Sequence, residues 1–267
     1  MLSDRRSPDG HTVHRIEAGE GGFQFTITGW GIFHISADGR RVLCAPVRMP
    51  TWRWQRYLVG QLLPFVSVLH GYEVFHASVV TRESRTIALT GGSGAGKSSL
   101  ATALMLRGWT LVADDVLVAE AATDGGVIAH SSTSLTNLRH DAARRLTKAE
   151  LDRLGRFVGG DDQSLRILTP TSGDAHRLTE LFVLERGEQG PPVEPLRPVD
   201  PKLLLAATFN FLVQTPGRLA RQLDMCHRIA TTVQIGRVLV TDEHGPAALA
   251  EHVEHLVDRS AGTVTPR

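Results

Sequence analysis

The chain has 267 residues, 42% of them hydrophobic, and its formal net charge is +1. This length suits one large domain or a core with a small subdomain, and the near-zero charge favours neither nucleic acid nor an anionic membrane. The two cysteines, Cys44 and Cys226, match no metal-binding spacing, and the N-terminus lacks a signal-peptide pattern. We therefore expect a soluble, cytoplasmic protein with buried free thiols and with neither a nucleic-acid partner nor a membrane partner.

The first part of the chain predicts a small antiparallel β layer. Residues 1–12 are polar and are expected to be frayed. Apolar and polar side chains alternate over 13–44, and the Asp38–Gly39 step indicates a hairpin. An amphipathic helix over about 54–69 and a strand over 74–80 are predicted next.

A phosphate-binding pattern follows. A β-branched, apolar run at 86–90 predicts a buried strand, and the Ala- and Leu-rich run 98–107, which includes Ser99, predicts a helix that stops at Gly108. Between them, the pattern G-x-x-x-x-G-K-[ST] is matched by Gly91, Gly92, Ser93, Gly94, Ala95, Gly96, Lys97 and Ser98. In such a loop, backbone N–H groups surround an anion, the lysine reaches the β- and γ-phosphates, and the serine is a Mg²⁺ ligand. The pattern predicts a site for a nucleoside triphosphate with a divalent metal, and a plain glycine turn is the alternative.

The apolar strand predicted at 111–113 ends in two adjacent aspartates, Asp114 and Asp115. A carboxylate at this place can hold Mg²⁺ or take a proton from an attacking hydroxyl. Adjacent strand residues point to opposite faces, so at most one aspartate faces the phosphates unless the strand bends. The alternative is a pair that caps a helix or closes a turn. His76 precedes the loop, and on its own it indicates little, because most histidines are structural or solvated.

The rest of the chain alternates strands and helices, which indicates an α/β fold. Strands are predicted within 127–139 and over about 164–168, 177–185 and 233–240, and helices over about 141–154, 201–212, 217–231 and 247–257. Loops are predicted at the glycine- and proline-rich segments 124–126, 159–162 and 191–192.

The spacing of His76, the loop and the Asp114–Asp115 pair resembles the catalytic core of the HPr kinase/phosphorylase family, which belongs to the phosphoenolpyruvate carboxykinase group. The family pattern is similar to H…G-D-S-G-x-G-K-S-E…R-G-H-x-L-x-A-D-D. The resemblance implies an α/β fold that consists of a P-loop kinase core of this type, which uses ATP and Mg²⁺, with a small N-terminal antiparallel β layer. It implies that Lys97 binds phosphate and that Ser98 binds the metal. It further implies that Asp114 is the general base, that His76 orients or tunes this base, and that Asp115 supports the base or the metal.

The chain departs from the family pattern at several positions. Gly92 stands where the family has aspartate, and Ser99 stands where it has glutamate. Asn137 replaces a metal-binding glutamate, which weakens the expected second metal contact and the expected phosphorylase activity. Arg139 matches the arginine of the family signature L-E-I-R-G. Arg139 and Arg166 are candidate clamps for the γ-phosphate, since phosphoryl transfer needs cationic stabilisation, and an ordinary ion-paired arginine is the alternative for each.

The chain resembles more closely the shorter HPr-kinase-like proteins of bacterial peptide-modification clusters, which include kinases of lasso-peptide precursors. The shared features are a short β-rich N-terminal part, the Phe75–Ser78 strand and the Leu181–Glu185 segment. This resemblance predicts a subdomain at 1–56, a catalytic domain at 57–267, and an ATP-dependent kinase acting on a serine of a peptide or small protein. The alternatives are a small-molecule hydroxyl kinase and a non-catalytic, nucleotide-dependent regulator. The choice between ATP and GTP and the presence of a homo-oligomer are left open.

Overall fold

In the computed structural model of the chain, residues 2–8, 12–132, 134–160, 164–196, 198–209, 215–241 and 243–261 are described. They form two compact units, one from Met1–Tyr72 with Asn210–Leu219 and one from Glu73–Phe209 with Ala220–Arg267. Both strands and helices are present, as expected of a mixed α/β fold. The division expected at residues 56 and 57 falls within the helical segment of the first unit. Among the described helices, none combines the length and the hydropathy that a membrane crossing requires.

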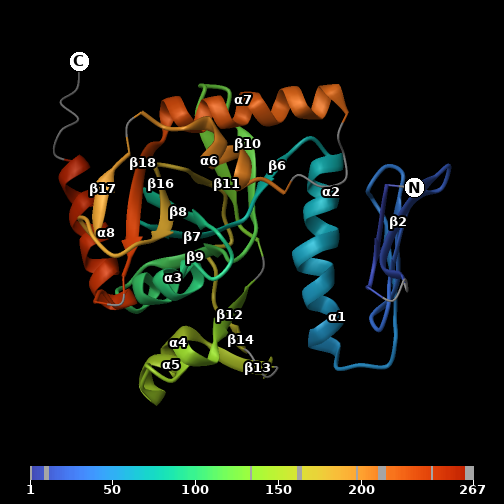
Figure 1. Ribbon diagram of the computed structural model, residues 1–267, viewed down its shortest axis with the longest axis horizontal. Helices are drawn as coiled ribbons and strands as arrows, with labels where there is room; N and C mark the ends of the chain where they lie inside the picture. Colours follow the sequence, from blue (N-terminus) through green and yellow to red (C-terminus); the bar gives the residue numbers. More distant parts are fainter. Residues whose placement is uncertain are drawn as a thin grey trace. The chain divides into compact units, whose positions relative to one another are not determined.

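The first unit is built on a five-stranded antiparallel sheet, which confirms the predicted β layer (Figure 1). In both chain order and sheet order, its strands are β1 (Ser3–Arg6), β2 (Thr12–Gly19), β3 (Gly22–Ile27), β4 (Gly31–Ser36) and β5 (Val42–Pro46). Because β1 pairs with β2, the expectation of a frayed segment is wrong for residues 3–6. The predicted helix is present as α1 (Thr51–Tyr57), the π-helical turn η1 (Leu58–Leu62) and α2 (Leu63–Leu69).

One face of this sheet carries the core of the first unit. Phe25 and Phe33 point to that face and are almost fully buried. The ring of Phe65, on α2, packs edge-on against Phe23 and Phe25, with ring centroids 4.8 and 5.2 Å away. Side chains alternate between the two faces of a strand, so the apolar set of residues 13–44 meets the apolar stripe of the helical segment.

The second unit is built on a six-stranded sheet with the order β17-β18-β16-β8-β7-β9 (Figure 1). Its strands are β7 (Ala77–Arg82), β8 (Arg85–Gly91), β9 (Thr110–Ala113), β16 (Glu180–Arg186), β17 (Val193–Pro195) and β18 (Gln234–Val240). The strands β18, β16 and β8 are parallel, so their carboxyl ends meet at one edge of the sheet. Because β7 is antiparallel to both β8 and β9, the start of β7 and the end of β9 lie at this same edge.

Helices cover both faces of the six-stranded sheet (Figure 1). On one face, α3 (Lys97–Leu106) and α8 (Pro246–Ala261) pack on side chains such as Ile87 and Leu89 of β8. On the other face, α6 (Pro201–Ala206) and α7 (Pro216–Thr232) pack with the alternate residues, such as Ala88. A strand buried on both faces reads as a continuous apolar run, which explains the composition of residues 86–90.

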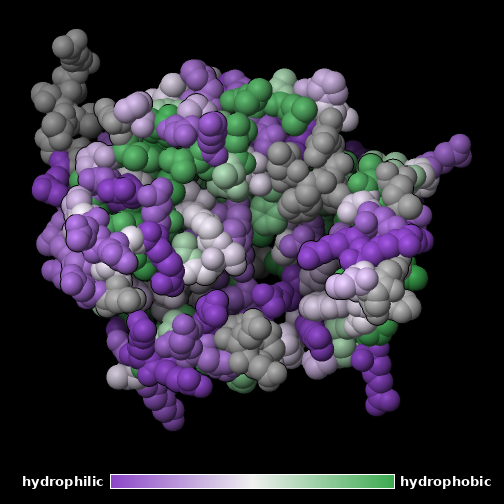
Figure 2. All heavy atoms as spheres, in the orientation of Figure 1, coloured by the Kyte–Doolittle hydropathy of each residue, from purple (hydrophilic) through white to green (hydrophobic). Residues whose placement is uncertain are grey.

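Two smaller sheets complete the second unit. The sheet with the order β15-β11-β10-β6 consists of β6 (Glu73–Phe75), β10 (Leu117–Ala121), β11 (Val127–His130) and β15 (His176–Arg177). The sheet with the order β12-β14-β13 consists of β12 (Leu135–Arg139), β13 (Arg156–Gly160) and β14 (Ser164–Leu168), and it carries α4 (His140–Ala143) and α5 (Lys148–Leu154). Hydrophilic residues cover much of the visible surface over α4 and α5 (Figure 2).

Some predicted elements are divided in the structure. The strand expected over 74–80 is split at His76 into β6, which pairs with β10, and β7, which pairs with β8. The helix expected over 141–154 is interrupted, because Thr147 caps α5 through a reciprocal pair of hydrogen bonds with Glu150.

Other predicted elements differ at their ends. The segment expected as a loop over 159–162 is a strand as far as Gly160, and residues 161 and 162 lie outside the described residues. The helix expected over 201–212 ends at Ala206, and its last three residues also lie outside the described part of the chain. The helices expected over 217–231 and 247–257 are confirmed as α7 and α8.

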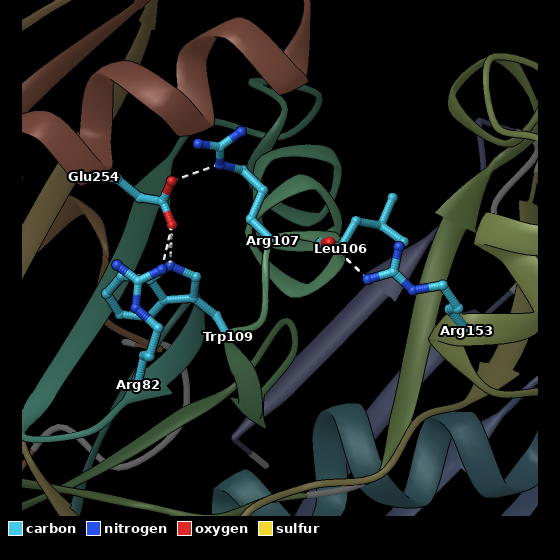
Figure 3. Close-up of polar contacts among 6 residues, drawn as sticks. All are labelled: Arg82, Leu106, Arg107, Trp109, Arg153 and Glu254. Carbon is cyan, nitrogen blue, oxygen red and sulfur yellow. Dashed lines mark hydrogen bonds and ion pairs between the residues drawn. The ribbon is translucent and has the colours of Figure 1, made fainter.

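A buried carboxylate, Glu254 of α8, joins this helix to the sheet and to the end of α3 (Figure 3). Its Oε1 accepts from Trp109 Nε1 at 2.8 Å and from Arg82 Nη1 at 2.5 Å, and its Oε2 accepts from Arg107 Nε at 2.5 Å. Burial alone raises the pKa of Glu254, but hydrogen bonds from Trp109 and Arg107 and the charges of both arginines hold this pKa below its usual value. The ionised carboxylate is therefore part of the folded structure.

Replacing Glu254 by glutamine is expected to lower the free energy of unfolding by about 2–4 kcal/mol, because it removes the charge that two arginines and an indole N–H surround. The difference shrinks in acid, since a carboxylate with a depressed pKa contributes stability above its unfolded pKa and loses it as the pH falls through its folded pKa. Denaturant unfolding near neutral pH and in acid measures both effects. The control is Glu251→Gln on the exposed side of α8. Equal losses in the two variants, or a loss independent of pH, would contradict this role.

Candidate functional site

The phosphate-binding pattern forms the connection between β8 and α3, at the edge where the parallel strands end. Gly91 has φ of 145° and Gly96 has φ of 103°, a region that residues with a side chain rarely adopt. A Cβ on Gly91 would also lie 2.5 Å from the carbonyl oxygen of Leu184 on β16, so the loop and the neighbouring strand require glycine here. Ala95 is buried, and the loop residues with exposed side chains or backbone are Gly92, Ser93 and Gly94.

Lys97 turns back over this loop. Its side chain is buried, and its Nζ donates to the carbonyl oxygens of Gly91 at 3.0 Å and Gly92 at 3.1 Å. Burial lowers the pKa of the Lys97 ammonium, although the charges of Asp115 and Asp114 act in the opposite direction. The loop therefore holds a cation whose present acceptors are neutral carbonyl groups.

Asp114 follows the end of β9 and is the most heavily hydrogen-bonded carboxylate of this edge among the described residues. Its Oδ1 accepts from Ser78 Oγ at 2.7 Å, from Ser98 Oγ at 3.1 Å and from the Asp115 backbone N–H at 3.1 Å. Its Oδ2 accepts from the backbone N–H of Asn137 at 3.1 Å. These donors come from β7, α3, β12 and the turn after β9, so Asp114 is the point at which the four segments meet.

The protonation of Asp114 is set by burial. Burial is the larger cause and the neighbouring charge of Asp115 the smaller one, and together they raise the pKa of Asp114 to about 6. The hydrogen bonds from Ser78, Asn137 and Ser98 act in the opposite direction and lower this pKa. A carboxylate with a pKa near 6 is a stronger base than an ordinary aspartate and is still ionised at neutral pH. Both properties suit a group that takes a proton from a hydroxyl.

The chain bends just after β9, at Asp115, which has φ of 65°, an uncommon value for a residue other than glycine. This turn brings the second carboxylate to the same side as the first, since Asn137 Nδ2 donates to Asp115 Oδ2 at 2.9 Å while its backbone N–H donates to Asp114. The sequence allowed only one of two adjacent aspartates to face the site unless the strand bends. The structure has the bend, and both carboxylates contact Asn137.

His76 lies where the chain passes from β6 to β7. Its Nδ1 is 3.0 Å from the Asp115 carbonyl oxygen, and because a carbonyl only accepts, Nδ1 carries the hydrogen and Nε2 is left as an acceptor. Burial and the charge of Lys97 lower the pKa of His76, so the ring is neutral at neutral pH. His76 thus holds the strained backbone of Asp115 in place, and no described hydrogen bond joins it to the carboxylate of Asp114.

The oxygen atoms of this cluster fit a magnesium ion. Mg²⁺ prefers oxygen ligands, and the Ser98 hydroxyl, the Asp114 carboxylate and the Asp115 carboxylate are joined here by hydrogen bonds to one another or to Asn137. The side-chain Oδ1 of Asn137 is buried and has no hydrogen-bond partner within the described part of the chain. A buried amide oxygen is costly to leave unpaired, and a cation bound beside Asn137 would satisfy it.

The other predicted site residues lie at different distances from this cluster. Ser99 is in the first turn of α3. Arg166 is fully buried on β14, directly opposite Asn137 in the β12–β14 register, so the two side chains share a face of that sheet. Arg139 is exposed, with its Nε 3.7 Å from Asp141, and no described contact joins it to the loop.

Two contacts of the site were not predicted. Ser78 is completely buried and donates to Asp114, whereas the sequence indicated it only as the last residue of the Phe75–Ser78 strand. Arg186, at the end of β16, donates from Nη2 to the carbonyl oxygen of Gly94 at 3.2 Å. Nothing in the local sequence distinguishes it from the chain's other arginines.

No protein-family model matches the chain, and no curated protein matches it. Among solved structures, it is similar to the HPr(Ser) kinase/phosphatase from Coxiella burnetii, with 17% sequence identity and a TM-score of 0.38, over 70% of this chain and 98% of that one. At this identity and TM-score, the likeness carries neither an activity nor site residues to this chain. The function is therefore inferred from the arrangement of the residues themselves.

Replacing Ser78 by alanine is expected to raise the pKa of Asp114 further, because it removes a hydroxyl that donates to the charged carboxylate. The carboxyl-carbon NMR shift of Asp114, followed against pH, measures the midpoint. The control is Ser131→Ala, because the Ser131 hydroxyl donates to the backbone oxygen of Val112 instead. A midpoint that stays the same or falls in the Ser78 variant would show that this hydrogen bond does not stabilise the ionised form.

Proposed function

We propose that the chain is an ATP-dependent kinase, a phosphotransferase that moves the γ-phosphate of ATP to a hydroxyl group, with a serine of a peptide or small protein as the acceptor. The observation that carries the proposal is the 3.1 Å hydrogen bond between Ser98, at the end of the loop, and the buried Asp114. It joins a loop suited to phosphate with a carboxylate whose pKa is raised to about 6. A phosphoryl donor site and a proton acceptor are the two parts that transfer to a hydroxyl needs.

The loop binds the phosphates of ATP. The N-terminus of α3 directs backbone N–H groups and the positive end of the helix dipole at an anion. Lys97 exchanges the neutral carbonyl oxygens of Gly91 and Gly92 for phosphate oxygens, which are stronger acceptors because the hydrogen bonds are charge-assisted on both sides.

The acceptor hydroxyl loses its proton to Asp114. The Oδ2 atom has the spare acceptor capacity, because Oδ1 already accepts three hydrogen bonds and Oδ2 accepts one. The hydroxyl oxygen then forms a bond to the γ-phosphorus as the bond to the bridging oxygen breaks and ADP leaves. His76 acts indirectly, through the backbone of Asp115 that it holds.

A magnesium ion, when bound, supplies charge neutralisation for the phosphates. The residues that would hold it are Ser98, Asp114 and Asp115, with the unpaired Oδ1 of Asn137 as a fourth oxygen. An amide oxygen is a weaker ligand than a carboxylate, so Asn137 would hold a metal less tightly than a glutamate in the same place would.

The peptide acceptor is supported by the resemblance of Phe75–Ser78 and Leu181–Glu185 to short peptide kinases. The two cysteines, Cys44 and Cys226, are free thiols in the structure, which fits a reducing compartment such as the cytoplasm.

The test is incubation with Mg²⁺–ATP and a pool of serine-containing peptides, followed by peptide mass measurement. Wild-type protein is expected to add phosphate, and Lys97→Ala to add none, because the loop loses its cation. The matched control is Lys148→Ala, on the exposed start of α5. ATP binding without transfer to any peptide would favour a small-molecule hydroxyl kinase or a nucleotide-dependent regulator.

Replacing Asp114 by asparagine is expected to lower kcat by about 10²–10⁴-fold while nucleotide binding is retained, since the general base is lost but the loop is not. Single-turnover transfer and nucleotide titration separate the two effects. Transfer at the wild-type rate by this variant would remove Asp114 from the role of base.

Two variants of Asn137 test the metal site with opposite expected signs. Alanine removes the unpaired oxygen and is expected to weaken metal binding about tenfold, whereas aspartate adds a charge and is expected to strengthen it. Mn²⁺ binding, followed by electron paramagnetic resonance without substrate, gives a readout that does not depend on activity. Equal Mn²⁺ affinities in the three proteins would place the metal elsewhere.

A further inference from the structure

Arg186 lies beside the phosphate-binding loop and has no part in the transfer described above. It ends β16, the strand next to β8 in the sheet, and its side chain is exposed. Its Nη2 donates to the carbonyl oxygen of Gly94 at 3.2 Å, at the turn where Gly94 has φ of 76°. A guanidinium therefore sits at the rim of the loop, in contact with a neutral acceptor and open to solvent.

The order of the strands places Arg186 on a definite side of the loop. In the strand order β16-β8-β7-β9, the loop follows β8. His76, just before β7, and Asp114, just after β9, lie on one side of the loop. Arg186 comes from β16, on the other side. The loop is thus flanked by the proposed proton acceptor on one side and by an arginine on the opposite side.

We propose that the nucleoside end of the bound nucleotide lies on the β16 side, where Arg186 binds the phosphates nearest the nucleoside. This inference rests on the proposed kinase function. The γ-phosphate must lie next to Asp114 and Ser98 for transfer, so the rest of the polyphosphate chain extends away from them, toward β16. The planar guanidinium of arginine suits phosphate oxygens, because it can donate two parallel hydrogen bonds.

The present contact of Arg186 is one that a nucleotide can replace. A hydrogen bond from an exposed guanidinium to a neutral carbonyl is weaker than a charge-assisted bond to phosphate, and Gly94 lies at the exposed tip of the loop. The Nζ of Lys97 likewise donates to neutral carbonyl oxygens, those of Gly91 and Gly92. Both cations therefore rest on loop carbonyls that the phosphates of a nucleotide would displace.

The test compares ATP with ADP, which share the phosphates nearest the nucleoside and differ in the γ-phosphate. The dissociation constants of fluorescent ATP and ADP analogues are measured for wild-type protein, Arg186→Gln and Arg186→Lys. We expect Arg186→Gln to weaken the binding of both nucleotides by the same factor, roughly tenfold. Arg186→Lys is expected to restore part of this loss, because lysine keeps the charge but lacks the paired N–H donors of the guanidinium. The matched control is Arg177→Gln, an exposed arginine of β15 paired with Asp124, which is expected to change neither constant.

The outcomes separate this inference from the proposed function. Unchanged binding of both nucleotides in Arg186→Gln would overturn the inference and leave the kinase proposal standing. Weakened binding of ATP alone would put Arg186 on the γ-phosphate and would also overturn it. If the wild-type protein binds neither nucleotide, the proposed function fails first. Thermal unfolding of each variant confirms that the exposed substitution leaves the fold intact.

Discussion

The arrangement of the site depends on keeping one carboxylate, Asp114, buried and hydrogen-bonded to four donors. An ionised carboxylate out of water costs several kcal/mol unless donors surround it. Here the donors are Ser78, Ser98, Asn137 and the backbone of Asp115, each from a different segment of the second unit. A shift of any one of these segments removes one of the four hydrogen bonds from the buried charge. The same hydrogen bonds that stabilise Asp114 therefore also hold the loop, the two aspartates and β12 relative to one another.

The break in the chain at His76 has a related effect. A continuous strand over residues 74–80 would have remained in one sheet, whereas β6 pairs with β10 and β7 pairs with β8. His76, between these two strands, pairs with neither β10 nor β8. Its backbone N–H donates to the carbonyl oxygen of Ala207, and its ring Nδ1 donates to the carbonyl oxygen of Asp115. The strained turn at Asp115 therefore persists because a neighbouring element holds it.

The local parts of the site could be predicted from the sequence, and the contacts between segments could not. The loop is encoded by glycines, a lysine and a serine at fixed spacing, and its strand and helix follow from apolar periodicity. The roles of Ser78 and Asn137 depend instead on how β7 and β12 lie beside the end of β9, which a single sequence does not specify. Similarly, Arg186 reaches Gly94 only because β16 is parallel to β8 and adjacent to it.

If the chain is the kinase proposed above, the balance of charge in the site favours joint binding of a nucleotide and a metal. The two carboxylates Asp114 and Asp115 lie on one side of the loop, Lys97 lies within the loop, and Arg186 lies on the other side, so the formal charges of these four side chains sum to zero. A triphosphate brings several negative charges into a region that already holds two, and Lys97 with Arg186 cannot offset both sets. A divalent cation held by these residues would reduce this repulsion, and it would also satisfy the buried oxygen of Asn137. In the proposed kinase, the carboxylates would therefore couple phosphate binding to metal binding, and the loop cations alone would make a weak anion site.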